Sequence, residues 1–274
     1  MKFALVNNAR TEAIKGVKGY CPFCGSELIP RCGSIKIHHW AHKSKLNCDH
    51  YWETETLWHR FWKNNYPSEW QEKIFFDDQT GEKHIADVFT DYNLVLEFQH
   101  SHIDPQERIA RERFYKNMTW VIDGTRLKRD YPRFLKEVLN FCPFDKSDTF
   151  FVDNPAKCFP STWLGSTVPV VFDFLGADAC RDLFDERSHL YCLLPFKMDE
   201  SAILIRMDRD IFIKLTRNSV WMLFILEWEE KLKAREKNKQ ILEMNRLRFS
   251  HTRKRKGSPL VFERGKWRKR YPRL

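Results

Sequence analysis

The segment His84-Ile-Ala-Asp87-Val88, followed after a short turn by Val95-Leu-Glu97-Phe-Gln99-His-Ser101, decides the fold that this sequence predicts. Its apolar residues indicate two neighbouring strands, Ile85–Phe89 and Leu94–Gln99. A charged side chain within a core strand is costly unless something offsets the charge. Because alternate residues of a strand share a face, Glu97 and Gln99 are expected on one face, with Asp87 beside them on the neighbouring strand.

Two carboxylates from adjacent strands can share a hard cation, so Asp87 and Glu97 are candidate ligands for Mg²⁺ or Mn²⁺, with the carbonyl of Phe98 as a further oxygen ligand. Such an ion activates water for attack on a phosphodiester and stabilises the leaving oxygen. The alternative is that Asp87 is a turn or edge residue and Glu97 a surface strand residue. Spacing alone favours this alternative, because paired acids around a hairpin are common.

Upstream, a helix is expected over Trp52–Asn64, and Glu55, His59 and Lys63 recur on one of its faces at intervals of four residues. Glu55 could add a carboxylate to the metal site, His59 could orient a phosphate or water, and Lys63 could supply positive charge. By itself, the spacing favours a salt-bridged surface helix. The downstream arginines Arg108, Arg111 and Arg113 are likewise expected at the solvated surface.

The segment Cys21-Pro-Phe-Cys24-Gly25 has the form of a zinc knuckle, in which two thiolates two residues apart point into one tetrahedral site. The downstream candidates for the other two ligands are His38, His39, His42, Cys48, Asp49 and His50. Thiolate suits Zn²⁺, so Cys48 is chosen first and His42 second, with His39 close behind. The alternatives are buried free cysteines beside surface histidines, or a redox pair, which the absence of a βαβ pattern disfavours.

Composition and chain pattern limit the class of protein. The chain has 274 residues, of which 42% are hydrophobic, enough for a sizeable core. The N-terminus lacks the apolar segment of a signal peptide, and there is no run of 18 apolar residues. We therefore expect a cytoplasmic protein with no membrane span, in which the eight cysteines are thiols or metal ligands.

The net charge of +10 resides entirely in the C-terminal part. From Lys231 onward there are 17 Lys or Arg against three acids, which indicates a nucleic-acid partner because such side chains displace counterions from phosphates. The candidate phosphate contacts form two basic clusters, Arg253, Lys254, Arg255, Lys256 and Arg268, Lys269, Arg270. Charge alone also fits a solvated, partly disordered tail.

The pattern of elements predicts an α/β fold with four parts: a zinc-binding β module at 1–50, a small α/β domain at 51–145, a strand-rich region at 146–230, and a helix end with a basic tail at 231–274. Strands are also expected at Lys2–Val6, Glu27–Arg31, Ser34–Ile37, Lys73–Phe76, Thr119–Ile122, Val168–Phe174, Leu190–Pro195 and Ala202–Ile205. Further helices are expected at Pro105–Asn117 and at about 213–249.

Over roughly its first 125 residues the chain resembles the CoiA-like competence proteins. Six segments carry the resemblance in one order: Tyr20-Cys-Pro-Phe-Cys24, His39-Trp-Ala-His42 with the residues through Cys48, Glu55-Thr-Leu-Trp-His59 with Lys63, Ile85-Ala-Asp87-Val88, Leu96-Glu97-Phe-Gln99, and Arg111-Glu-Arg113 through Trp120-Val-Ile122. The resemblance implies a nuclease-like domain of the PD-(D/E)XK type, a mixed sheet flanked by helices. It reverses the preference at Asp87 and Glu97 in favour of a metal site.

Two positions depart from the patterns. Trp40 stands where the family usually has Phe, and Gln99 stands where the general PD-(D/E)XK pattern has Lys, although Gln is typical of the CoiA-like group. A neutral amide can orient water or phosphate but supplies no positive charge. Lys63 or Lys83 is a candidate to supply that charge.

The leading hypothesis is a Mg²⁺-dependent deoxyribonuclease, in foreign-DNA or phage defence or in DNA uptake and processing, with a protein of that system as a further partner. Asp87 and Glu97 would hold the metal, and Gln99, Glu55, His59 and Lys63 would support the reaction. The rival is a catalytically silent DNA-binding module that acts in competence, recombination or repair through partners. An RNA-acting enzyme is a third, weaker alternative.

Overall fold

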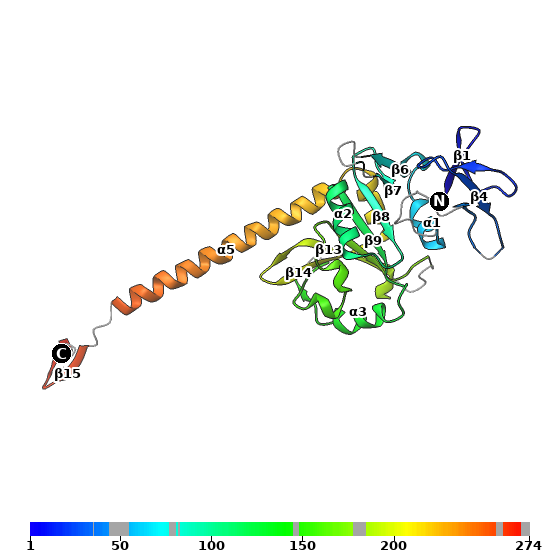
Figure 1. The fold of residues 1–274 in the computed structure, drawn as a ribbon. Coiled ribbons are helices and arrows are strands. Elements are labelled where there is room, and N and C mark those ends of the chain that lie inside the picture. The colour runs from blue at the N-terminus through cyan, green and yellow to red at the C-terminus, as the bar shows by residue number, and fades with distance from the viewer. Residues whose placement is uncertain are drawn as a thin grey trace. The chain divides into compact units, whose positions relative to one another are not determined.

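The computed structural model describes residues 1–34, 36–43, 55–76, 81, 83–144, 148–177, 185–255 and 260–269 (Figure 1). The chain forms two compact units, Met1–Leu223 and Phe224–Leu274. The first unit contains a small N-terminal sheet and a large mixed sheet with helices. The second contains most of the longest helix and a C-terminal hairpin.

The N-terminal sheet has five strands in the order β2-β1-β3-β4-β5, all paired antiparallel. Their bounds are β1 Phe3–Val6, β2 Ala9–Glu12, β3 Gly19–Tyr20, β4 Glu27–Arg31 and β5 His39–His42. Its core is small and centres on the fully buried Trp40, whose indole N–H donates to the carbonyl of Thr11 at 2.8 Å. Gly19 leaves room for this ring, because a Cβ there would lie 3.0 Å from Trp40.

The strand predicted at Ser34–Ile37 is wrong for the residues described there, since Ser34, Lys36 and Ile37 are not in a strand. The strand that pairs with β4 is β5, which begins at His39, and in this pairing Pro30 lies opposite Trp40 and Arg31 opposite His39. Trp40 is the large apolar side chain that this small core buries, so it sets where the pairing begins.

The large sheet has nine strands in the order β10-β11-β14-β13-β12-β9-β8-β7-β6. Their bounds are β6 Gln71–Phe76, β7 Lys83–Phe89, β8 Val95–Gln99, β9 Met118–Asp123, β10 Cys142–Pro143, β11 Thr149–Val152, β12 Val170–Asp173, β13 His189–Met198 and β14 Ser201–Asp208. Among the strand pairs that the structure describes in this sheet, only those of β9 with β8 and with β12 are parallel. The predicted mixed α/β class is therefore confirmed. Strands from both sides of residue 145 join this sheet, and the predicted division into four parts stays a prediction.

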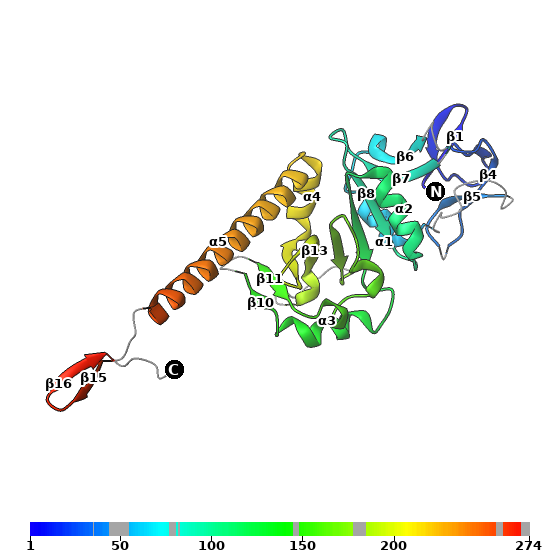
Figure 2. The ribbon, with the colours of Figure 1, turned by 60° about the vertical axis from the view of Figure 1, so that its left-hand side comes forward.

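The helices of the first unit are α1 Leu57–Lys63, α2 Pro105–Tyr115, α3 Asp130–Val138 and α4 Arg209–Arg217, with short 3₁₀ turns η1 Ser68–Trp70, η2 Pro155–Lys157, η3 Ser161–Trp163 and η4 Glu186–Ser188. Phe98 of β8 packs against Trp58 and Trp62 of α1, while its neighbour Glu97 pairs with Arg111 of α2. Because consecutive residues of a strand point to opposite faces, α1 and α2 cover opposite faces of the sheet at β8 (Figure 2).

The long helix predicted at about 213–249 is divided in the structure. Helix α4 ends at Arg217, and α5 runs over Trp221–Arg255. Ser219, between them, has a φ of 58°, a left-handed conformation that stops helix propagation. Trp221 is fully buried, packs on Phe212 of α4, and donates to the hydroxyl of Thr119 at 2.7 Å. This tertiary contact stabilises the break between α4 and α5. A separate difference from the sequence analysis is helix α3, which was not predicted.

In the second unit, α5 is followed by the antiparallel hairpin of β15 Leu260–Glu263 and β16 Lys266–Lys269. Of the predicted basic contacts, Arg253, Lys254 and Arg255 lie in α5, and Arg268 and Lys269 lie in β16. Lys256 and Arg270 fall outside the described residues. Within the part of the chain that the structure describes, no helix combines the length and the apolar character needed to cross a membrane.

Candidate functional site

Two sets of hydrogen bonds fix the position of helix α1, which carries Lys63. At its start the Thr56 hydroxyl accepts the backbone N–H of His59, and the His59 ring accepts that of Thr56, which is a capping box. Further along, the indole N–H groups of Trp58 and Trp62 both donate to the fully buried carboxylate of Asp173 in β12, at 2.9 and 3.1 Å. These anchors hold the helix, and with it Lys63, against the sheet.

Lys63 lies at the centre of a buried carboxylate cluster. Its ammonium is 2.9 Å from Asp87, 3.2 Å from Glu55 and 3.2 Å from Glu72, and its side chain is only 4% exposed. Burial lowers the pKa of Lys63, but Asp87, Glu55 and Glu72 together raise it well above its ordinary value. Lys63 therefore keeps its positive charge at neutral pH. Its contacts bring the carboxylates of Glu55 and Asp87 into one cluster.

The same cation controls the charge of its buried partners. Burial raises the pKa of Glu55, but Lys63, the N-terminal ammonium and Arg60 lower it more, to about 2. Burial also raises the pKa of Glu72, but Lys63, the N-terminal ammonium and the backbone N–H of Lys2 together lower it by more, so the net shift of this pKa is downward. Both carboxylates are thus ionised at neutral pH.

Glu72 also connects the N-terminal sheet to the large sheet. Its two carboxylate oxygens accept the backbone N–H groups of Lys2 and Phe3 at 2.6 and 3.1 Å. Its own φ is 46°, an uncommon backbone conformation for a non-glycine residue within a strand. No pattern in the sequence had singled out this residue, because its role depends on pairing with a segment 70 residues earlier.

Asp87 is the most accessible acid of the cluster, with a side chain that is 21% exposed. Strands β7 and β8 pair at Val88 with Leu96 and at Phe89 with Val95. Next to these pairs the second oxygen of Asp87 accepts the backbone N–H of Phe98 at 2.9 Å. Asp87 therefore bridges α1 and β8, the strand that carries Glu97 and Gln99.

Glu97 is held from the opposite helix. Its carboxylate accepts a guanidinium N–H of Arg111 in α2 at 3.1 Å, and Arg111 is also 3.3 Å from Glu107. The expectation that Arg108 and Arg111 lie at the solvated surface is wrong, since they are 4% and 6% exposed; Arg113 is exposed as expected. Asp87 and Glu97 thus contact different cations, from α1 and α2, and their sharing of one metal ion stays a prediction.

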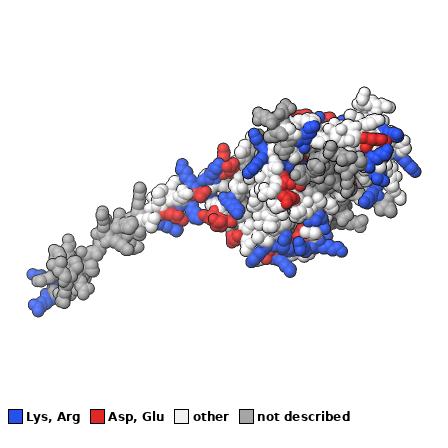
Figure 3. All heavy atoms as spheres, in the orientation of Figure 1, with Lys and Arg blue, Asp and Glu red and all other residues white. Residues whose placement is uncertain are grey.

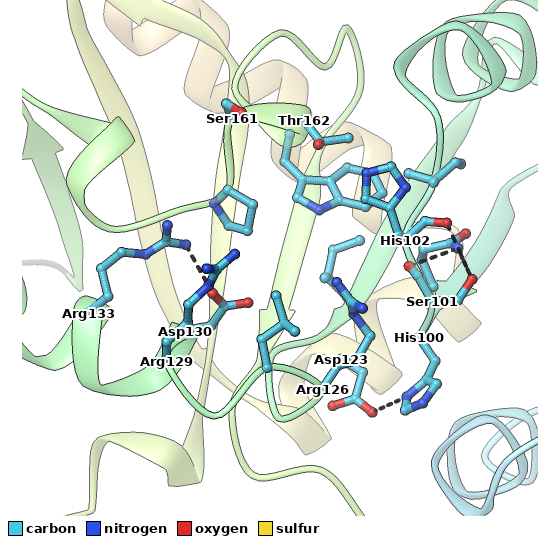
Figure 4. Close-up of a pocket in the computed structure, with 16 residues that line it drawn as sticks. His100, Ser101, His102, Asp123, Arg126, Arg129, Asp130, Arg133, Ser161 and Thr162 are labelled. Carbon is cyan, nitrogen blue, oxygen red and sulfur yellow. Dashed lines mark hydrogen bonds and ion pairs between the residues drawn. The ribbon is translucent and has the colours of Figure 1, made fainter.

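Gln99 lies at the end of β8, where its amide donates to the carbonyl of Ser101 at 3.3 Å. It also lines a cavity of about 300 Å³ (Figure 4). The ring of His59 lies 6.0 Å from that of His100, another residue lining this cavity. His59 therefore caps α1 and lies close to the end of β8, outside the contacts of Lys63.

The knuckle brings three ligand atoms together. The sulfurs of Cys21 and Cys24 and a ring nitrogen of His42 lie within 4.8 Å of one another, and Cys24 Sγ is 3.3 Å from His42 Nε2. Two thiolates and an imidazole suit Zn²⁺, so the donor set fits this metal. His39 Nδ1 is instead 2.8 Å from the carbonyl of Ile37, which favours His42 over His39. Cys48, the predicted fourth ligand, lies outside the described residues.

The fold and this Cys/His group define a mixed α/β protein with a candidate metal-binding module at its N-terminus. Residues 5–51 match the family model described as Competence protein CoiA, N-terminal domain. The N-terminal module is therefore similar to this family, and the match confirms the resemblance over these residues. No curated protein and no solved structure matches the chain.

Proposed function

We propose that the protein is a Mg²⁺-dependent deoxyribonuclease of the PD-(D/E)XK type, with its site at Asp87, Glu97 and Gln99. The observation that carries the proposal is the 2.9 Å contact between the Lys63 ammonium and Asp87. A nuclease of this type uses acids from adjacent strands together with a positive charge. Gln99 cannot supply that charge, whereas Lys63 brings it to Asp87 from α1.

The donor atoms fit a hard divalent cation in their chemistry. Asp87 and Glu97 provide carboxylate oxygens, and Asp87 is the member that solvent reaches. Mg²⁺ held by these two residues would supply Lewis-acid stabilisation and a more acidic water. In the absence of bound metal, Lys63 and Arg111 form ion pairs with the two carboxylates and hold them in place.

Hydrolysis consumes one water molecule. Its oxygen gives up a proton and forms a new bond to phosphorus, the bond from phosphorus to the leaving sugar oxygen breaks, and that sugar oxygen takes up a proton. The Gln99 amide can orient the attacking water or a phosphate oxygen. The Lys63 ammonium, with its raised pKa, acts as a fixed positive charge and not as a base.

The N-terminal module and the basic tail have supporting roles in this proposal. Zn²⁺ held by Cys21, Cys24 and His42 would stabilise a sheet whose apolar core is small. The Lys and Arg residues beyond Lys231 would bind DNA phosphates irrespective of sequence. The similarity of the N-terminal module to the CoiA family is consistent with DNA uptake or processing as the setting, or with defence against foreign DNA.

The test is cleavage of supercoiled plasmid, linear duplex, single-stranded DNA and RNA, with Mg²⁺ or Mn²⁺ added or omitted. We expect metal-dependent cleavage of DNA by the wild type. An Asp87→Asn, Glu97→Gln variant should lose at least about 100-fold, the scale of losing a transition-state contact. Asp91→Asn, at an exposed turn position of the same hairpin, is the control and should cleave normally. Equal results for wild type and double variant on every substrate would refute the proposal.

One observation favours a second candidate, a DNA-binding module without catalytic activity. Asp87 and Glu97 are each paired with a protein cation, so their charges are balanced without a metal. Under this alternative, the double variant binds DNA as the wild type does, and neither protein cleaves it.

A further inference from the structure

The cavity beside Gln99 lies at the carboxyl ends of two parallel strands. Strand β8 ends at Gln99 and β9 ends at Asp123, and these ends contribute His100, Ser101 and Asp123 to its wall. Ligands of α/β proteins commonly bind at this edge of a parallel sheet, where the chain leaves the strands in different directions. The opposite wall comes from the segment around α3 and from η3 (Figure 4).

Cationic groups gather on the α3 side of this cavity. Arg126, Arg129 and Arg133 all line it, and Arg133 is paired with Asp130 at 3.3 Å. Among the described residues, no acidic group forms an ion pair with Arg126 or Arg129, and both are exposed to solvent. The cavity therefore has two guanidinium groups available for an anion.

The acid on the other side of the cavity is already engaged. Asp123 is 2.7 Å from the ring of His100, and its other oxygen accepts the backbone N–H and the hydroxyl of Thr125 at 2.9 and 2.6 Å. Figure 4 shows His100 and Asp123 directed toward each other below the space that the other labelled side chains surround. Asp123 is thus held by its own neighbours, and the excess charge of the cavity is positive.

The remaining lining suits a phosphate attached to a nucleoside. Ser161, Thr162 and His102 offer polar hydrogen-bonding groups, while Trp163 and Pro160 add apolar surface. The volume of about 300 Å³ is at the lower end of the range for small-molecule sites. A phosphate monoester carries nearly two negative charges at neutral pH, which matches two available guanidinium groups better than the single charge of a diester does.

A basic surface lies beside the same cavity, on and next to α3. Figure 3 shows Lys and Arg side chains gathered on the part of the first unit where Figure 1 places α3. The exposed basic residues there are Lys128, Arg129 and Lys136. Such a surface attracts the polyanionic backbone that follows a bound phosphate.

We propose that this cavity binds the terminal phosphate monoester of a nucleic acid strand or of a free nucleotide, with Arg126 and Arg129 as its guanidinium ligands. The choice of a nucleic acid or nucleotide as the source of this phosphate rests on the proposed function. Gln99 lines this cavity and also belongs to the proposed nuclease site, so a phosphate bound here would fix a strand end close to the scissile bond.

The experiment measures binding of fluorescent single-stranded oligonucleotides to the full chain without Mg²⁺, so that no cleavage is needed. One oligonucleotide ends in a phosphate at its free 5′ terminus and the other in a hydroxyl. We expect the phosphorylated strand to bind about tenfold more tightly, the effect of one charge-assisted contact. An Arg126→Gln, Arg129→Gln variant should lose this preference. The control is a Lys128→Gln, Lys136→Gln variant, which also removes two positive charges close to the cavity. This control should retain the preference for the phosphorylated strand. Thermal melting checks that both variants fold.

Competition separates the two sources of the phosphate. If deoxyadenosine monophosphate displaces the labelled phosphorylated strand at a concentration similar to that of the unlabelled strand, the cavity accepts free nucleotides. If it does not, the cavity requires a strand. Equal affinity of the wild type for both oligonucleotides, or an unchanged preference in the arginine variant, would overturn the inference. If the wild type cleaves plasmid but shows no preference for the phosphorylated strand, the cavity proposal alone is refuted. If the wild type shows the preference but cleaves no substrate, the nuclease proposal alone is refuted.

Discussion

At the scale of single residues, Lys63 is the group on which the candidate site depends. It is a buried cation that contacts Asp87, Glu55 and Glu72. Removing one partner of such a group is far more damaging than replacing the whole group with apolar residues, because it leaves uncompensated charge in the interior. Lys63 therefore stabilises the fold and, under the proposed function, also supplies charge to the site.

Lys63→Met keeps most of the side-chain volume but removes the charge. We expect it to lower the free energy of unfolding by about 3 to 5 kcal/mol, measured by urea denaturation at neutral pH. Lys73→Met, at an exposed position of β6, is the matched control and should change it by less than about 0.5 kcal/mol. A Lys63→Met protein as stable as the control would contradict this prediction, because the negative charge of the buried carboxylates would then be compensated without Lys63.

The pKa of Glu55 predicts a dependence of stability on pH. This pKa is about 2 in the folded protein against an ordinary value of 4.5, so the ionised carboxylate stabilises the fold above pH 4.5. That stabilisation is lost as the pH falls from 4.5 toward 2. In melting curves recorded across this window, Glu55→Gln should lose less stability than the wild type, while the exposed control Glu69→Gln should follow the wild type. Parallel curves for Glu55→Gln and wild type would exclude this role.

Part of this cluster could be predicted from the sequence. The spacing predicted Glu55 and Lys63 on one face of a helix over Trp52–Asn64. The described helix begins only at Leu57, and the two side chains are 3.2 Å apart. His59 has the same spacing, but its ring caps α1 and does not join the cluster. The helix begins after its N-cap residue Thr56, so Glu55 lies before the first turn. Glu72 and Arg111 could not be predicted, because their roles arise from contacts between elements that no local pattern records.

At the scale of elements, the knuckle holds the ends of two short strands together. Cys21 directly follows β3, and His42 is the last residue of β5. The core beside them is small, so metal binding should contribute much of the stability of this sheet.

We expect about one zinc ion per chain by elemental analysis of the purified protein. Cys24→Ser should reduce the zinc content strongly and expose the N-terminal sheet to limited proteolysis. Cys32→Ser is the matched control, since the Cys32 sulfur contacts the carbonyl of Ala13 and lies outside the Cys/His group. A Cys24→Ser protein with as much zinc as Cys32→Ser would contradict the assignment.

Strands β8 and β9 were predicted correctly from their apolar residues, and every residue of both strands is buried. The elements that were missed depend on tertiary contacts. Helix α3 has one fully buried residue, Phe134, which contributes to the main core. The break between α4 and α5 follows from the packing of Trp221 and not from a proline or glycine.

At the scale of the whole molecule, the charge is unevenly distributed along the chain. The segment from Lys231 carries 17 of the 47 Lys and Arg residues, and the remainder has more acids than bases. Sequence could predict this distribution and the mixed α/β class. It could not predict that strands before and after residue 145 form one sheet, since strand order is set by non-local pairing.

Removal of residues 251–274 should weaken DNA binding and reduce its salt dependence, because fewer phosphate contacts release fewer counterions. Fluorescence anisotropy with a duplex oligonucleotide at several salt concentrations measures both effects. An unchanged slope of log affinity against log salt would assign the tail another role.

The central claim is that Asp87 and Glu97 hold a hard divalent cation, and direct binding of Mn²⁺ followed by electron paramagnetic resonance tests it without reference to any substrate. With the zinc site loaded, the wild type should bind about one Mn²⁺ per chain, and Asp91→Asn should do the same. The Asp87→Asn, Glu97→Gln variant should bind none at this site. Equal Mn²⁺ binding by wild type and double variant, or none by either, would contradict the claim.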